Sequence, residues 1–120
     1  DAANRVKLML DAYMRWGLEH PNAYELVFCN VARLAAVIGE EETTADLGDQ
    51  CYQVFSGVVR EIAAEGRLRT GTADSAAQAL WTACHGVVSM MIARPNFEWA
   101  PTDELIHVTL DGLMHGLVAD

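Results

Sequence analysis

The sequence predicts a single all-α domain of about five helices that occupies residues 1–120. Three observations indicate this fold class. Apolar residues recur every three or four positions, no segment alternates apolar and polar residues between hairpin turns, and proline or glycine separates stretches of helical length. A chain of 120 residues with 52% hydrophobic and 21% charged residues can bury one self-supporting core.

The first helix is expected from about Ala2 to Glu19. Its charged residues at positions 7, 11, 15 and 19 alternate in sign, which predicts a solvated stripe. The other, apolar side consists of Val6, Met9, Leu10, Tyr13 and Trp16. Because the residue before a proline avoids the α region, His20 and Pro21 should end this helix. Pro21 also suits the first position of a second helix, which is expected to reach Gly39.

The third helix is expected to follow an acidic, solvated loop at Glu40–Glu42 and to end at about Glu65. Thr43 and Asp46 have the spacing of a capping box at its start. Gly66 stands directly after its end, where glycine commonly terminates a helix in the left-handed conformation. Local signals thus predict both ends of this helix.

The fourth helix is expected from Thr72, a suitable N-cap, to Ala93, after which Arg94 and Pro95 terminate it. The fifth is expected to open at Pro101 and to run to the end of the chain. Residues 75–93 carry no formal charge, so length alone would allow a membrane span. The polar residues spread through this stretch argue against one, and burial on two sides is the simpler interpretation.

Small residues line one side of each of the last two helices. In the fourth helix this side consists of Ala76, Ala79, Ala83, Gly86 and Met90, and in the fifth of Leu105, Thr109, Gly112 and Gly116. The stripe expected to face the core in the fifth helix is Ile106, Leu110, Leu113 and Leu117. Each interior glycine costs on the order of 1 kcal/mol of helix propensity relative to alanine, which close helix contact can offset.

These small-residue sides are therefore expected to meet their copies in a homodimer, where the last two helices of each subunit form a four-helix bundle. One alternative is that the small residues pack inside the monomer. Another is a helical protein–protein interaction module without a ligand cavity, whose small-residue side binds a different protein.

Several short motifs, taken in order, resemble a known family. Residues 81–86, WTACHG, contribute a W-x-x-x-H-G string to a helix, and upstream YMRWGLEHP at 13–21 precedes YELVF at 24–28. This order is similar to the C-terminal, ligand-sensing and dimerisation domain of TetR-family transcriptional regulators of the W-H-G type. The resemblance implies the effector-sensing domain of a repressor, in which an N-terminal helix-turn-helix domain binds operator DNA as a dimer.

We expect that DNA-binding domain to be absent from this chain. Because the sequence opens directly into a helical pattern without an initiator methionine, we expect it to be the interior or C-terminal part of a longer polypeptide. Eight lysines and arginines against 17 aspartates and glutamates give a net charge of −9. Such a charge disfavours contact with phosphate backbones or anionic membranes, so operator DNA is expected to be bound only through the missing domain.

Aromatic residues on four helices are candidates for an effector pocket between helices, and the expected effector is a small apolar or aromatic molecule. The candidate ligand-binding residues are Tyr13, Trp16, Phe28, Tyr52, Phe55, Trp81, His85 and Val88. Core packing is the competing explanation for each ring, and His85 could be a core histidine whose neighbours satisfy it.

Neither catalysis nor a cofactor is expected. No catalytic or nucleotide-binding motif is present, and Cys84 and His85 are adjacent on a helix, so they point about 100° apart and form no natural dyad. His107, Asp111 and His115 follow at i, i+4 and i+8, which leaves a small metal-binding helical protein as a further alternative. A stripe of this kind on the polar side is usually solvated, so no metal site is expected.

Three widely spaced cysteines without CxxC spacing predict buried, reduced thiols and a cytoplasmic protein. The first residues also lack the basic and apolar regions of a signal peptide.

Overall fold

The computed structural model describes residues 1–29 and 44–120. These residues form α1 (Ala2–Glu19), α2 (Pro21–Tyr24), the π-helical turn η1 (Glu25–Cys29), α4 (Thr44–Ala64), α5 (Ala73–Ala93) and α6 (Thr102–Leu117). Within them there is no strand beyond an isolated bridge between Leu68 and Val118. The predicted all-α class is therefore confirmed. The expected extension of the second helix to Gly39, the acidic loop and the capping pair at 43 and 46 lie outside the described residues and side chains.

The helix ends form where local hydrogen bonds satisfy their free backbone groups. The Asp1 carboxylate accepts a 2.9 Å bond from the N–H of Asn4 at the start of α1. At the start of α5, Thr72 and Ser75 form a reciprocal capping box, with serine in the place where glutamate is usual. Gly66 follows α4 with φ of +71°, and its N–H and that of the next residue bond back to the last turn.

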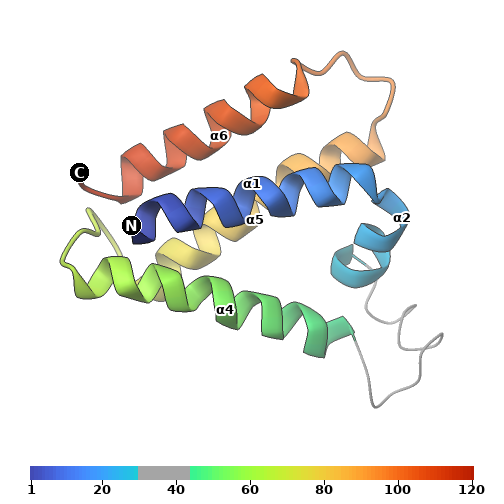
Figure 1. Ribbon diagram of the computed structural model, residues 1–120. Coiled ribbons are helices and arrows are strands. Elements are labelled where there is room, and N and C mark those ends of the chain that lie inside the picture. Colours follow the sequence, from blue (N-terminus) through green and yellow to red (C-terminus); the bar gives the residue numbers. More distant parts are fainter. Residues whose placement is uncertain (30–43) are drawn as a thin grey trace.

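The helices form a slab whose thinnest dimension is 20 Å, which is the thickness of two helices. Figure 1 shows α1 in the middle, with α4 along one side, α6 along the other and α5 behind. The two chain ends lie at the same end of the slab (Figure 1). Arg67 joins them, because its guanidinium lies 3.6 Å from the Asp1 carboxylate and donates to the carbonyl of Ala119.

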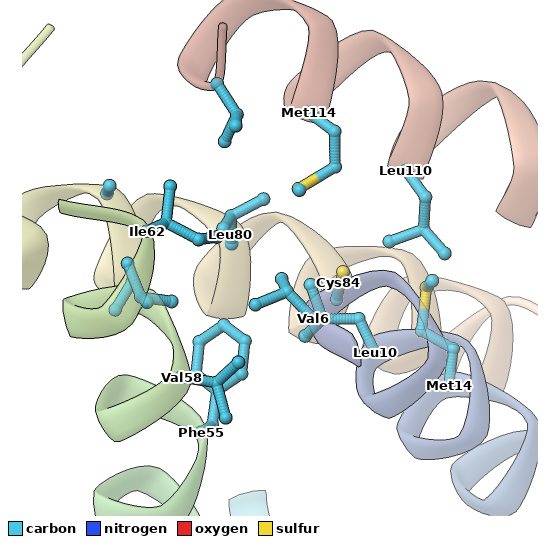
Figure 2. Close-up of a cluster of buried hydrophobic side chains, with 14 of the residues drawn as sticks. Val6, Leu10, Met14, Phe55, Val58, Ile62, Leu80, Cys84, Leu110 and Met114 are labelled. Carbon is cyan, nitrogen blue, oxygen red and sulfur yellow. The ribbon is translucent and has the colours of Figure 1, made fainter. Parts of the chain in front are cut away.

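All four long helices contribute to one core, which Figure 2 shows in close-up. Its labelled members are Val6, Leu10 and Met14 of α1, Phe55, Val58 and Ile62 of α4, Leu80 and Cys84 of α5, and Leu110 and Met114 of α6. Because α1 contacts each of the other three, its apolar residues hold the slab together.

α6 ends at Leu117 rather than at the end of the chain, because Val118 is in extended conformation. The core stripe of α6 also differs from the predicted one. Met114 and Val118 are buried with Ile106 and Leu110, whereas Leu113 and Leu117 are only partly buried. The buried residues are spaced by four, and such a row drifts around the helix by about 40° per step. A helix that crosses its neighbours at an angle buries a row of this kind, and the crossing angle is a tertiary property.

Two further expectations are corrected. The charged stripe of α1 is not freely solvated, because Lys7 and Arg15 pair with carboxylates of α6. Cys29 and Cys51 are exposed rather than buried, and only Cys84 lies in the core. The ion pairs of α1 depend on the position of α6, which no local pattern specifies.

Candidate functional site

A cavity of about 460 Å³ lies between α1, η1, α4 and α5. Its volume falls within the range of small-molecule sites in proteins. The lining residues are Met9, Leu10, Tyr13, Phe28, Gly48, Gln50, Cys51, Tyr52, Val54, Phe55 and Trp81. The wall is thus mostly aromatic and aliphatic.

Five of the eight predicted ligand-binding residues line this cavity: Tyr13, Phe28, Tyr52, Phe55 and Trp81. Their rings meet closely, since Tyr13 and Phe28 lie 5.3 Å apart in edge-to-face geometry and Tyr52 and Trp81 lie 5.4 Å apart. Residues from four separate segments therefore converge on one volume, which single-helix patterns alone do not specify.

The other three predicted residues lie elsewhere. Trp16 is 38% exposed on the outer side of α1, where it stacks on His20. Val88 is fully buried in the core, and His85 lies outside the cavity wall. Each shares a helix with a lining residue but points in a different direction.

Six lining residues were missed by the sequence reasoning: Met9, Leu10, Gly48, Gln50, Cys51 and Val54. A signal for some of them existed, because Met9 lies one turn before Tyr13 and Cys51 lies one turn before Phe55. Selecting aromatic residues alone excluded these aliphatic and small neighbours.

The cavity wall carries no formal charge among the described residues. A charged ligand would lose its hydration there without a counter-ion, at a cost of several kcal/mol. One polar group of the wall is unsatisfied within the described part of the chain, because the Tyr52 hydroxyl is buried and has no hydrogen-bond partner there. The electrostatics therefore favour an uncharged ligand.

A chain of hydrogen bonds extends from Trp81 and Tyr13 in the cavity wall to His85, which lies outside the wall. The indole N–H of Trp81 donates to the Tyr13 hydroxyl over 3.2 Å. The Tyr13 and Tyr24 hydroxyls lie 2.6 Å apart, and the Tyr24 hydroxyl lies 2.6 Å from Nδ1 of His85. His85 is therefore a histidine whose hydrogen-bonding needs are met by a neighbour, and that neighbour connects it to the cavity.

Burial controls the protonation of this chain. It raises the pKa of both Tyr13 and Tyr24, so the two hydroxyls stay protonated. It lowers the pKa of His85, which favours the neutral imidazole at neutral pH. A neutral chain can form all three bonds without burying a charge.

Gly17 brings α1 close to Tyr24, the middle member of this hydrogen-bonded chain. A Cβ at this position would lie 2.7 Å from Cδ1 of Tyr24 and 2.8 Å from Cγ1 of Val88. No side chain larger than hydrogen fits without moving one of these neighbours. The absence of a side chain at Gly17 therefore lets α1 pack directly against Tyr24.

The small-residue sides of α5 and α6 are largely open in the described monomer. A Cβ at Gly86, Gly112 or Gly116 would meet no described atom within 4 Å. Met90 of α5 is 47% exposed, and Val108 of α6, which the sequence reasoning missed, is 61% exposed. Packing inside the monomer therefore does not account for these glycines.

Ala76 is a correction to this set, because it is 2% exposed and belongs to the core. It lies toward the edge of the small-residue side, where α5 already contacts its own subunit. The remaining predicted residues are exposed or half-buried. We call these the small-residue face: Ala79, Ala83, Gly86, Met90, Leu105, Val108, Thr109, Gly112 and Gly116.

α5 is also a described helix long and apolar enough to cross a membrane by length and composition. In the structure it packs against α1, α4 and α6 of the same subunit. The Asp111 carboxylate is engaged by two side chains of the protein, since it lies 2.8 Å from His107 and 2.7 Å from Lys7. Among the described residues there is no group of three or more side chains that could hold a metal ion.

The comparisons with known proteins agree with this architecture. The family model for the tetracyclin repressor-like, C-terminal domain matches residues 6–118. No curated protein and no solved structure gives a significant match. The matched range runs from α1 to the end of α6, so it includes both the cavity and the small-residue face.

Proposed function

Because the chain belongs to the family of tetracyclin repressor-like C-terminal domains, we propose that it is the effector-binding and dimerisation domain of a TetR-like repressor. The family is regulatory and not enzymatic. We propose one domain over residues 1–120 and a cytoplasmic location. Operator DNA would be bound by a helix-turn-helix domain outside these residues, in keeping with the net charge of −9.

The cavity supports an effector site for a small, uncharged, apolar or aromatic molecule. Its size suits such a ligand, its wall lacks formal charge, and α1, α4 and α5 all contribute side chains. A molecule in this position touches three helices at once, so its binding energy depends on how these helices are arranged. An effector shifts the regulator between two states only by its difference in affinity for them, and a tenfold difference corresponds to about 1.4 kcal/mol.

The glycines of the small-residue face carry the proposal of a homodimer. Gly86, Gly112 and Gly116 each cost about 1 kcal/mol of helix propensity relative to alanine, yet no described atom of their own subunit needs the space. Only 28% of the most apolar window of α5 is buried within the subunit. Close approach of a second copy would explain both features, because glycine and alanine let helix backbones approach.

The size of the face is sufficient for a dimer. α5 and α6 have 21 and 16 residues. They are therefore roughly 31 and 24 Å long, and two adjacent helices of these lengths present roughly 600 Å² in projection. Two copies would then bury roughly 1,200 Å², which is the lower limit for stable interfaces.

The test is the oligomeric mass of the protein and of Gly86→Leu. The leucine side chain would separate the two copies of α5, so the variant should elute as a monomer where the wild type is a dimer. Size exclusion with light scattering at micromolar concentration measures this directly. Ala64→Leu, which places a leucine side chain at an exposed position of α4, is the control and should stay dimeric.

A full dimer of Gly86→Leu would show that the small-residue face is not the interface. A monomeric wild type would contradict dimerisation altogether. Co-purification of the wild type with a different protein in fixed ratio would instead favour the helical interaction module.

A further inference from the structure

The hydrogen-bonded chain begins inside the cavity wall and ends outside it. Tyr13 and Trp81 line the cavity, whereas Tyr24 and His85 do not. The three bonds, of 3.2, 2.6 and 2.6 Å, connect α5 to α1, α1 to α2, and α2 back to α5. A change in the protonation of His85 can therefore alter the hydrogen bonding of Tyr13 in the cavity wall, and a change at Tyr13 can alter the hydrogen bonding of His85.

Counting the protons gives the chain a direction. An indole N–H can only donate, so Tyr13 accepts at that end. When Nδ1 of His85 is bare, Tyr24 donates to it and Tyr13 donates to Tyr24, so each bond has one proton and one acceptor. When Nδ1 carries a proton, it donates to Tyr24, and both hydroxyls must reverse.

The reversed arrangement changes what Tyr13 offers to the cavity. Tyr13 then accepts from both Trp81 and Tyr24, which are its hydrogen-bond partners among the described residues, so neither of them can take its own proton. Leaving a hydroxyl proton unbonded in an apolar site is unfavourable. A ligand in the cavity with a hydrogen-bond acceptor, such as a carbonyl oxygen, would supply the missing partner.

We propose that Tyr13 is the specificity-determining polar contact of the cavity, and that binding of a neutral aromatic ligand with a hydrogen-bond acceptor is coupled, through Tyr24, to proton uptake at His85. This inference rests on the proposed effector site. It defines the ligand class by hydrogen-bond polarity, and it makes the response to an acceptor ligand dependent on pH.

Burial, rather than a charge on a neighbouring described residue, sets the protonation of His85. The ring of Tyr24, from α2, stacks on His85 at 5.6 Å. On α5 itself, the neighbouring Cys84 stays a neutral thiol because burial raises its pKa to about 12. From α1, Tyr13 reaches His85 only through Tyr24. Among the described residues, no carboxylate or cation contributes to the lowered pKa of His85.

The sign of the pH effect follows from this environment. The free protein holds His85 neutral near pH 7, and with its single ring proton on Nε2 the hydrogen-bonded chain has the arrangement in which Tyr13 donates to Tyr24. An acceptor ligand stabilises the reversed arrangement, in which Nδ1 carries a proton. Because Nε2 keeps its own proton in this proposal, the ligand raises the pKa of His85 in the complex. Affinity for an acceptor ligand should therefore increase as the pH falls, and up to one proton should be taken up per ligand bound.

Two probes of similar shape test the coupling in the whole protein, residues 1–120. 2-Acetylnaphthalene carries a carbonyl acceptor, 2-isopropylnaphthalene carries none, and neither titrates between pH 5 and pH 8. Calorimetric titration in two buffers of different ionisation enthalpy measures both affinity and proton uptake. The ketone should bind about three- to tenfold more tightly at pH 5.5 than at pH 8, the range expected for one hydrogen bond, with proton uptake. The hydrocarbon should show neither effect.

Two variants test the route. Tyr24→Phe removes the central hydroxyl without altering the cavity wall, and His85→Gln keeps an acceptor for Tyr24 but cannot titrate. Both should bind the ketone without pH dependence and without proton uptake. Circular dichroism establishes that each variant is folded, and either one suffices if the other fails to fold.

The outcomes separate this inference from the proposed function. Ketone binding to the wild type with constant affinity and no proton uptake would overturn the coupling and leave the effector site intact. Proton uptake that persists in both variants would overturn the assigned route. Failure of both probes to bind the wild type at any pH would overturn the effector site and this inference together.

Discussion

Replacing Gly17 by alanine should destabilise the protein, although alanine is the better helix former. The new Cβ would lie 2.7 Å from Tyr24 and 2.8 Å from Val88, both of which are fully buried. Tyr24 cannot move aside easily, because two 2.6 Å hydrogen bonds hold its hydroxyl. Overpacking of this kind costs about 2–3 kcal/mol, and the gain in helix propensity is about 1 kcal/mol. The expected net loss is about 1–2 kcal/mol.

Gly57→Ala in α4 is the matched control. A Cβ there meets only the Arg60 guanidinium, at an ordinary 3.6 Å, so the propensity gain should appear alone, at about 0.5–1 kcal/mol. For a chain of this length 1 kcal/mol corresponds to about 4 °C in Tm. Thermal unfolding at one protomer concentration should give Gly17→Ala a Tm lower by about 4–8 °C and Gly57→Ala a Tm higher by about 2–4 °C. A rise in Tm for both variants would refute the close approach of α1 to Tyr24.

Two further predictions concern single groups. Tyr52→Phe should increase the free energy of unfolding by about 1 kcal/mol, because it removes a buried hydroxyl that has no partner in the described structure. Urea unfolding measures this quantity, and a lower free energy of unfolding for the variant would show that the hydroxyl has a partner. His85→Gln should flatten the loss of stability below pH 6.5. Burial places the folded pKa of His85 below its ordinary 6.5, so the neutral form stabilises the fold above that pH and the unfolded chain takes the proton first as the pH falls. Equal slopes for variant and wild type in pH-dependent unfolding would contradict this.

Local signals in the sequence were sufficient for most helix ends. α1 and α5 end at the predicted residues because proline or a capping side chain acts within one turn of the helix end. Gly66 terminates α4 because its left-handed φ needs no distant partner. Hydrogen bonds of this range are encoded by neighbours in the chain, so a sequence pattern contains them.

The cavity was predictable only in part. Tyr13, Phe28, Tyr52, Phe55 and Trp81 were identified as aromatic residues on four segments, without evidence that they meet. His85 and Trp16 share helices with lining residues but lie outside the wall. Whether a ring lines a cavity or fills the core depends on the rotation of its helix relative to the next one, which is decided by packing between helices.

The sequence by itself determined the all-α class, most of the helix ends and the presence of a small-residue side on each of the last two helices. The tertiary structure decided which α6 row is buried, that Ala76 lies in the core, and that Tyr13, Tyr24 and His85 join in one hydrogen-bonded chain. The reason is one of range. Helical periodicity and capping act over three or four residues, whereas the contact between Tyr24 and His85 spans 61 positions and exists only once α1, α2 and α5 have packed together.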